Sequence, residues 1–361
     1  MKTDFAKNIS LINKDSFLTG SNFSSIADVV YAEAIDYKKI NKLNKDNIET
    51  ISQWNEDVVI YSIKNFTLKE NQIIFCKTDF ILDLFVKLKK VKLKNIKLIT
   101  HQAATPMIDK HLYKLKPKCI SEWFSINVSY VHENLIPIPL GLGNEFSKVG
   151  IHPDDIKEVN FNNEKNRIEK IYCNFDVNTN LIRKDFLKFA KTNKNIFETS
   201  NKRIEKLKFL EKLLNYKFVL CPPGVGVDTH RFWEALYLGC IPVTKKNYIY
   251  ERFFSGFYIS FKNIEELTNI RCEDIGQKEE LIKKLNLSFW EKIIKKNNID
   301  STRSVYINVD INRYRKNRDK LRKSYTRYKI LRSNFTTKTK FIDYLKTFKN
   351  LNQKLFDTYW R

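Results

Sequence analysis

The polar residues best suited to chemistry lie at the start of one predicted helix, in the segment 217–244, which reads KFVLCPPGVGVDTHRFWEALYLGCIPVT. His230 and Arg231 fall in the first helical turn, where free backbone N–H groups and the helix dipole favour an anion. A guanidinium binds phosphate oxygens through two parallel hydrogen bonds. Thr229 either caps the helix or binds phosphate, and Glu234, one turn later, can accept hydrogen bonds from sugar hydroxyls. A diphosphate attached to a ribose would satisfy all of these groups together.

A loop with two glycines precedes this helix. The run PPGVG at residues 222–226 predicts a loop, because proline and glycine disfavour the continuation of a strand or a helix. Gly224 and Gly226 suit the path of the backbone and also allow a ligand to approach it. Asp228, directly before the helix, is expected either to cap it or to take part in binding the ligand.

Each charged residue of this segment also has a purely structural interpretation. Arg231 could pair with a local acid, His230 could face solvent, and Glu234 could be an ordinary solvated helix residue. The position of Arg231 in the first turn after a glycine loop favours anion binding over these alternatives.

Alternating strand and helix patterns must position these residues. Short apolar runs predict buried strands in the first half of the chain at residues 58–63, 72–76, 96–100, 119–120 and 135–140. In the second half they predict strands at residues 170–174, 218–220, 240–244 and 257–261. Helical patterns lie between these runs, at residues 79–90, 183–191, 203–214, 230–238 and 247–254. The alternation predicts an α/β protein with doubly wound parallel sheets, in which ligands bind at the carboxyl ends of the strands.

The loop and helix resemble the donor-binding segment of exostosin-type glycosyltransferases and their bacterial and viral relatives. Those are two-domain enzymes of the GT-B fold that use nucleotide-activated sugars. The family pattern of Gly-x-Gly-x-Asp, Arg, Trp-Glu-Ala and Gly-Cys-Ile-Pro matches this chain from Gly224 to Pro242. Blocks at residues 98–142 and 172–183 are similar to other parts of the family. The resemblance implies two Rossmann-like domains facing across a cleft, a nucleotide diphosphate-sugar as co-substrate, and Glu234 as the acid that binds the ribose.

Three further residues belong to the block that resembles the opening of the family's C-terminal domain. Asn174 follows a predicted strand, Arg183 begins a predicted helix, and Thr179 lies between them. We expect all three to contact the donor, with Arg183 as a second cation for the diphosphate. The alternative is a surface arginine on an amphipathic helix.

An inverting transfer also needs a general base, which the N-terminal half would supply. Asp79 and His101 both follow predicted strands, where residues facing a cleft are expected. With Arg231, which would stabilise the leaving diphosphate, they are the candidate catalytic residues. Asp79 could instead cap a helix, and a retaining enzyme would need no such base, so the identity of the base stays open.

The sequence favours a mechanism without metal or cofactor. It contains no Asp-x-Asp triplet, which metal-dependent transferases of the GT-A type use to hold a divalent ion on the donor. The helix dipole and arginine would replace the ion. The six cysteines lack metal-ligand spacing, which predicts buried reduced thiols.

A break in the alternation and a change in charge suggest the domain organisation. Residues 1–145 are predicted to form an acceptor domain, 146–168 a linker, 169–300 a nucleotide-sugar-binding domain, and 301–361 a basic helical tail. The net charge is +24, and the tail holds 17 Lys and Arg against 4 Asp and Glu, a net +13. Nucleic acid, an anionic membrane surface or an acidic acceptor would fit this excess, although an AT-rich genome also produces many lysines.

We expect a cytoplasmic protein, because no apolar run is long enough to span a bilayer and the N-terminus lacks a signal-type apolar core. Its basic tail would dock on the inner face of a membrane. The expected activity is sugar transfer to a hydroxyl of a glycan or a lipid-linked acceptor. The alternatives are a basic nucleic-acid-binding protein and a catalytically inactive GT-B-like scaffold. The absence of a nucleic-acid-binding motif argues against the first, and the intact Asp228, Arg231 and Glu234 argue against the second.

Overall fold

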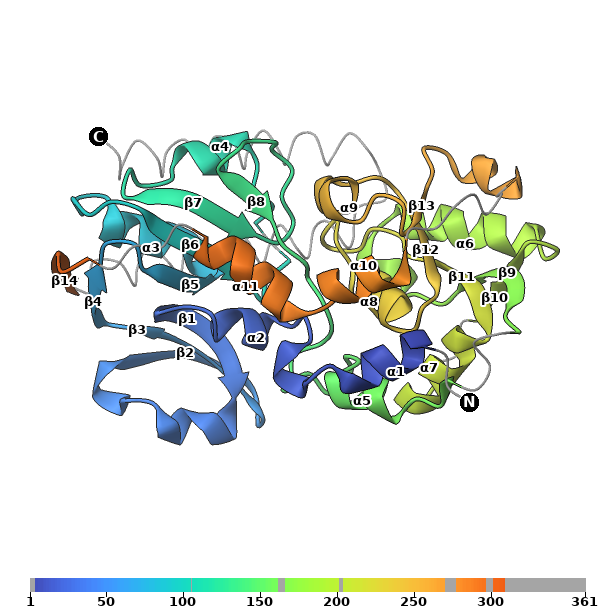
Figure 1. Ribbon diagram of the computed structural model, residues 1–361, viewed down its shortest axis with the longest axis horizontal. Coiled ribbons are helices and arrows are strands. Elements are labelled where there is room, and N and C mark those ends of the chain that lie inside the picture. The colour runs from blue at the N-terminus through green and yellow to red at the C-terminus, as the bar shows by residue number, and fades with distance from the viewer. Residues whose placement is uncertain are drawn as a thin grey trace.

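Two β-sheets that contain mainly parallel strands organise the chain (Figure 1). The computed structural model describes residues 4–104, 106–161, 166–200, 204–269, 277–296 and 301–308. Within these ranges, a seven-stranded sheet has the order β2-β3-β1-β5-β6-β7-β8, and a five-stranded sheet has the order β10-β9-β11-β12-β13. The predicted α/β class is therefore confirmed.

The first sheet combines parallel and antiparallel pairs. Its strands are β1 (Val29–Asp36), β2 (Ile48–Asn55), β3 (Val58–Ile63), β5 (Ile73–Lys77), β6 (Ile96–His101), β7 (Ile120–Ser125) and β8 (Leu135–Pro137). The pairs β1–β5, β5–β6, β6–β7 and β7–β8 are parallel. Strand β3 pairs antiparallel with both β1 and β2. Strands β5 and β6 are buried along their whole length, as their mainly apolar runs predicted.

Helix α3 (Ile81–Leu88) covers one face of this sheet. Its buried residues Ile81, Leu84, Phe85 and Leu88 recur at helical spacing and pack in the same core as Ile74 and Cys76 of β5. The short helix α2 (Gly20–Ser24) contacts the sheet at β1, β5 and β6, and its Phe23 joins a second core that contains Ile73 and Phe75. Helix α4 (Lys110–Lys114) precedes β7.

The second sheet is entirely parallel in its described pairs. Its strands are β9 (Ile168–Cys173), β10 (Phe197–Thr199), β11 (Tyr216–Leu220), β12 (Ile241–Thr244) and β13 (Ile259–Ser260). Across the sheet, the strands therefore lie in the order 2-1-3-4-5 when they are numbered along the chain. This order occurs in flavodoxin-like sheets, where ligands bind at the carboxyl ends of the two strands flanking the switch, here β9 and β11.

Helices pack on both faces of the second sheet. Helix α6 (Ile182–Thr192) shares a core with β9, β11 and β12, while α7 (Lys206–Leu214) and α8 (His230–Tyr237) belong to the core on the other side. Helix α9 (Tyr248–Phe253) follows β12 and stacks Tyr250 on Phe232 of α8, with ring centroids 3.6 Å apart.

The segment predicted as a linker is partly helical and partly buried. It contains α5 (Pro153–Glu158), which contacts α7 and buries Ile156. Residues 162–165 of this segment lie outside the described ranges. The domain boundaries stay predictions.

Segments near the two ends of the described chain each pack against the half of the molecule that is distant in sequence. Helix α1 (Asp4–Leu11) packs against α10 (Lys278–Lys284) in the second half of the molecule. In the opposite direction, α11 (Leu287–Lys295), orange in Figure 1, returns to the first sheet, where Lys97 of β6 donates to Ile294 O at 2.7 Å. Lys97 also donates to Lys296 O, so a buried ammonium caps the carboxyl end of α11.

The predicted helical tail is wrong for residues 304–308. They form β14 (Ser304–Asn308), which pairs antiparallel with β4 (Asn65–Lys69). The alternation of buried and exposed residues in β4 suits a strand with one solvated face, and β14 supplies its hydrogen-bonding partner. The rest of the predicted tail, residues 309–361, lies outside the described residues, as does Cys272. Among the described residues, no helix is both long and apolar enough to cross a membrane.

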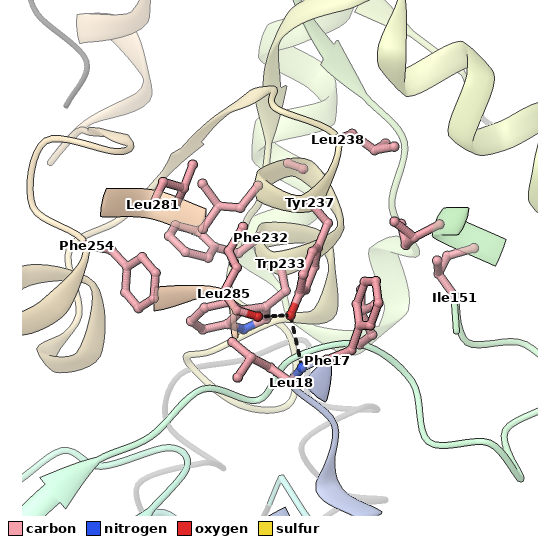
Figure 2. Packing of buried hydrophobic residues seen from close by; sticks show 14 of the residues in the cluster. Phe17, Leu18, Ile151, Phe232, Trp233, Tyr237, Leu238, Phe254, Leu281 and Leu285 are labelled. Carbon is pink, nitrogen blue, oxygen red and sulfur yellow. Dashed lines mark hydrogen bonds between the residues drawn. The ribbon is translucent and has the colours of Figure 1, made fainter. Parts of the chain in front are cut away.

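Tyr237 connects α8 to two distant segments (Figure 2). Its buried hydroxyl accepts from Leu18 N at 2.9 Å and donates to Leu285 O at 2.6 Å. We expect Tyr237→Phe to lower the free energy of unfolding by about 2–3 kcal/mol, because a buried N–H and a buried carbonyl both lose a partner. Urea denaturation measures the change, with Tyr306→Phe, at a position 63% exposed, as the control. Equal unfolding midpoints for the two variants would contradict this role.

Candidate functional site

Residues that follow strands of both sheets meet around the loop after β11, the 221–229 loop. Asn127, which follows β7, accepts from Asp228 N through Oδ1 at 3.1 Å. Leu140, which follows β8, donates its N–H to Asp228 Oδ2 at 2.8 Å. The carboxyl end of the first sheet is therefore hydrogen-bonded to the loop at the carboxyl end of the second.

The Asp228 carboxylate holds this loop in place through both of its oxygens. In addition to Leu140 N, it accepts from Trp233 Nε1 at 2.8 Å and from Tyr250 Oη at 2.7 Å, both through Oδ1. Burial raises the pKa of Asp228 to about 6, although the three hydrogen bonds favour the charged form. Of the two residues predicted as candidates for the helix cap, Thr229 occupies the N-cap position of α8 and Asp228 does not. These contacts fit a residue that shapes the loop rather than one that touches a donor.

Three residues at the start of α8 carry buried polar atoms without hydrogen-bond partners among the described residues. Thr229 occupies the N-cap position, but its Oγ1 makes no capping bond. Arg231 Nε lies 3.3 Å from Glu234 Oε2, and its guanidinium carbon lies 4.1 Å from the ring centroid of Phe209. Neither Nε nor Nη1 of Arg231, nor Oε2 of Glu234, has hydrogen-bond geometry to a described partner. The local ion pair foreseen as an alternative for Arg231 is present, and it leaves donors unused.

Unsatisfied polar atoms concentrate at this place. Asn127, Thr229, Arg231 and Glu234 together carry five buried side-chain nitrogen or oxygen atoms that have no hydrogen bond within the described residues. Leaving such atoms unpaired costs about 1–3 kcal/mol each, so native proteins satisfy most of them. An amide N–H, a hydroxyl, a guanidinium and one carboxylate suit a ligand that is anionic and carries hydroxyl groups.

His230 is an exposed residue in the first turn of α8. Its Nδ1 donates to Gly141 O at 2.8 Å, which adds another bond between the loop after β8 and the second sheet. This bond fixes the ring, and on protonation Nε2–H is the donor that remains for an anion. The solvent-facing alternative and the binding role are both compatible with this geometry.

The two glycines are required for space rather than for an unusual backbone, since φ is positive at neither. A Cβ on Gly226 would lie 2.4 Å from Asn127 Oδ1, and one on Gly224 would lie 3.0 Å from Arg183 Nη2. Gly224 also accepts from Asn180 Nδ2 at 2.9 Å. The space beside each glycine, which was predicted to admit a ligand, is thus filled by a side chain of the protein: Arg183 at Gly224 and Asn127 at Gly226.

Arg183 holds the beginning of the 221–229 loop through hydrogen bonds to its backbone. Its buried guanidinium donates to three carbonyls, those of Pro222 at 2.9 Å, Pro223 at 3.0 Å and Asp176 at 2.9 Å. Burial and the nearby charge of Arg231 lower the pKa of Arg183 to about 10. The alternative of a surface arginine is therefore wrong, and the predicted second cation lies with its donors turned to the protein.

Arg183→Lys keeps the charge but loses the fork that reaches three carbonyls, so we expect it to lower the free energy of unfolding by about 2–4 kcal/mol. The same change at the exposed Arg252 is the control and should cost less than about 0.5 kcal/mol. Urea denaturation compares them. A lysine variant as stable as the Arg252 control would show that charge alone matters at this position.

Asn174 and Thr179 lie near Arg183, at the carboxyl end of β9. Thr179 Oγ1 donates to Asp176 O at 3.2 Å and lies 3.8 Å from the position of a Cβ on Gly224. Asn174 Nδ2 lies 3.5 Å from the hydroxyl of Tyr172. Both residues therefore lie near the switch between β9 and β11, and their contact with a donor stays a prediction.

The two candidate bases lie at the carboxyl ends of β5 and β6. Asp79 forms an ion pair with the buried Lys77 at 2.7 Å and caps no helix, because the N-cap of α3 is Phe80. His101 is 1% exposed, its Nε2 donates to Pro139 O at 3.0 Å, and its Nδ1 accepts from Gln102 N at 2.7 Å. Burial lowers the pKa of His101 to about 3. A neutral imidazole with both nitrogens engaged favours support of the loop after β8 over base catalysis.

Sequence reasoning missed three residues of this site: Asn127, Trp233 and Tyr250. The tryptophan and tyrosine stood out only as apolar helix positions, although each carries a polar atom that seeks a partner when buried. Within the described residues, no three His, Cys, Asp or Glu side chains gather as ligands for a metal ion. The described cysteines are free and buried, as predicted.

Comparison with known proteins leaves the family open. No protein-family model matches the chain, and no curated protein matches it either.

Proposed function

We propose that the protein is a glycosyltransferase of the GT-B type. It would transfer a sugar from a nucleotide diphosphate donor to a hydroxyl of a glycan or a lipid-linked acceptor, without a metal ion. The observation that carries this proposal is a group of five buried polar atoms without hydrogen bonds in the described structure, four in Thr229, Arg231 and Glu234 at α8 and one in Asn127, beside the switch between β9 and β11. The resemblance of residues 222–242 to the donor segment of exostosin-type enzymes supports the same conclusion.

The diphosphate would lie at the N-terminus of α8. Backbone N–H groups of the first turn and the Arg231 guanidinium favour negative charge there, and the His230 ring lies beside them. Glu234 Oε2, which has no hydrogen bond within the described residues, would accept one from a ribose hydroxyl. Thr229 Oγ1 would donate to phosphate. As the bond to the sugar breaks, the charge on the leaving diphosphate rises, and fixed donors stabilise that state more than the bound donor.

The GT-B arrangement is supported by the hydrogen bonds that join residues after β7 and β8 to the 221–229 loop. In such an arrangement the acceptor would approach from the first sheet. Asp79, whose side chain is 28% exposed at the carboxyl end of β5, is the remaining candidate for a general base. Docking of the basic tail on an anionic membrane stays a prediction, because residues 309–361 lie outside the described structure.

Ligand binding tests the proposal directly. Thermal unfolding of the full chain in EDTA would be followed with UDP, GDP, CDP, ADP and dTDP, and then with the sugar adducts of the best nucleotide. A ligand at 100 times its Kd should raise the free energy of unfolding by about 2.7 kcal/mol. Sugar transfer is then measured with the adduct that binds. If none of the nucleotides stabilises the protein and a gel shift at physiological salt shows tight RNA or DNA binding, the nucleic-acid alternative replaces this proposal.

A further inference from the structure

Asn127 brings a side chain of the first sheet into the site. It follows β7, is 3% exposed, and has a backbone φ of 53°, in the left-handed region that few residues other than glycine adopt. Its backbone carbonyl oxygen accepts a hydrogen bond from Ile108 N at 3.1 Å, which helps to hold this backbone conformation.

The orientation of the Asn127 amide follows from its partner. A backbone N–H can only donate, so the atom that faces Asp228 N at 3.1 Å must be Oδ1. Nδ2 is therefore the other terminal atom, and its two hydrogens have no partner among the described residues. The side chain thus presents an unsatisfied donor in a fixed direction.

The unsatisfied donor lies against the middle of the 221–229 loop. A Cβ on Gly226 would come within 2.7 Å of Asn127 Nδ2, which places the amide at the loop backbone. Asp228, the next residue but one, is held by the same amide, and α8 begins directly after Thr229. The donor therefore belongs to the same region as the unpaired atoms of Thr229 and Arg231.

We propose that Asn127 Nδ2 donates to an anionic oxygen of the ligand held by the 221–229 loop and the start of α8, a phosphoryl oxygen of a diphosphate. The first sheet then contributes directly to the anion site, and ligand binding strengthens the contact between the sheets. This assignment rests on the proposed function only for the nucleotide part of the ligand, because the amide recognises the anion itself.

Inorganic pyrophosphate and nucleoside diphosphates are the two probes, measured by isothermal titration in EDTA. Asn127→Asp keeps the acceptor for Asp228 N but replaces the donor by an anionic oxygen, so affinity for pyrophosphate should fall by about 100-fold. Asn144→Asp is the matched control, because Asn144 Oδ1 likewise accepts a backbone N–H, that of Ser21 at 2.9 Å. The control should stay within about threefold of the unaltered protein, since its charge lies at a partly exposed position.

Asn127→Gly is a second variant that tests the same donor in case Asn127→Asp does not fold. Glycine adopts a φ of 53° without strain, so the variant should fold while losing about tenfold or more in pyrophosphate affinity. Pyrophosphate binding by the unaltered protein, lost in both Asn127 variants, supports the assignment even if no nucleotide binds, in which case only the nucleotide function fails. Affinities equal to that of the Asn144 control, or no binding of pyrophosphate by the unaltered protein, would overturn it.

Discussion

Arg231→Met should lower the affinity for the nucleoside diphosphate by about 100- to 1,000-fold, since two charge-assisted hydrogen bonds are lost. Methionine retains apolar volume beside Phe209, over which the guanidinium lies at 4.1 Å. The native contacts of Arg231 are this ring and the ion pair with Glu234, and two of its nitrogens lack hydrogen bonds to described residues. The loss should therefore appear mainly in ligand binding and sugar transfer, measured by titration and by product formation.

A double variant separates the ligand from the ion pair. Arg231→Met leaves the buried Glu234 without its cation, which could by itself distort the site. Glu234→Gln removes that charge but keeps an acceptor for a ribose hydroxyl. If the combined variant regains the affinity, Arg231 acts by neutralising Glu234. We expect it to remain as weak as Arg231→Met, while Arg252→Met, at an exposed position, binds normally.

The strands most visible in the sequence are short runs in which apolar residues predominate. The runs at residues 72–76 and 96–100 correspond to β5 and β6, which are buried throughout. Strand β1 lies in the middle of the same sheet and was not predicted, because Glu33 interrupts its apolar pattern. The structure satisfies that carboxylate with Tyr61 Oη at 2.7 Å and Ser24 Oγ at 2.8 Å. A partly buried acid whose partners lie on other elements cannot be recognised from its neighbours in the sequence.

Long-range pairing hid β14 in the same way. Its five residues become a strand because they pair with β4, more than 200 positions earlier. The five residues themselves carry no charge, but the stretch 301–361 as a whole is rich in Lys and Arg, which suggested a basic helical tail.

At the site, the sequence predicted what depends on local order and missed what depends on tertiary contacts. The glycine loop, the N-cap at Thr229 and the start of α8 at His230 are local features, and the structure contains them. The roles of Arg183 and His101 depend on carbonyls about 40 residues away, at Pro222 and Pro139. Both side chains were expected to face a ligand, and both instead hold a loop.

Asp228→Asn should lower the free energy of unfolding at pH 7 by about 2–4 kcal/mol. All three partners, Leu140 N, Trp233 Nε1 and Tyr250 Oη, donate to the carboxylate. An amide in its place directs N–H groups toward at least one of these donors, so a buried hydrogen bond is lost. Asp154→Asn, in which a half-exposed carboxylate loses its ion pair with Lys14, is the control and should cost about 0–1 kcal/mol.

The pH dependence gives this prediction a second and independent test. Burial raises the pKa of Asp228 from 3.8 in the unfolded chain to about 6 in the folded protein. The folded state therefore binds the proton more tightly, and stability from this group is fully present below pH 3.8 and is lost as the pH rises through 6. Relative to Asp228→Asn, the unaltered protein should gain about 2.4 kcal/mol between pH 7 and pH 4.

Urea denaturation at pH 4, 5, 6 and 7 measures this difference, and Asp154→Asn shows how much of any trend is general. A difference that is constant with pH, or that shrinks as the solution is acidified, would mean that the Asp228 carboxylate is not buried as its contacts require. Because Asp228 connects Leu140 of the first sheet to Trp233 and Tyr250 of the second, its loss should also weaken pyrophosphate binding. That weakening would come through displacement of the loop, so it should be accompanied by the loss of stability, whereas Asn127→Gly removes a single hydrogen bond to the loop, that to Asp228 N, and should weaken binding with a smaller loss of stability than Asp228→Asn.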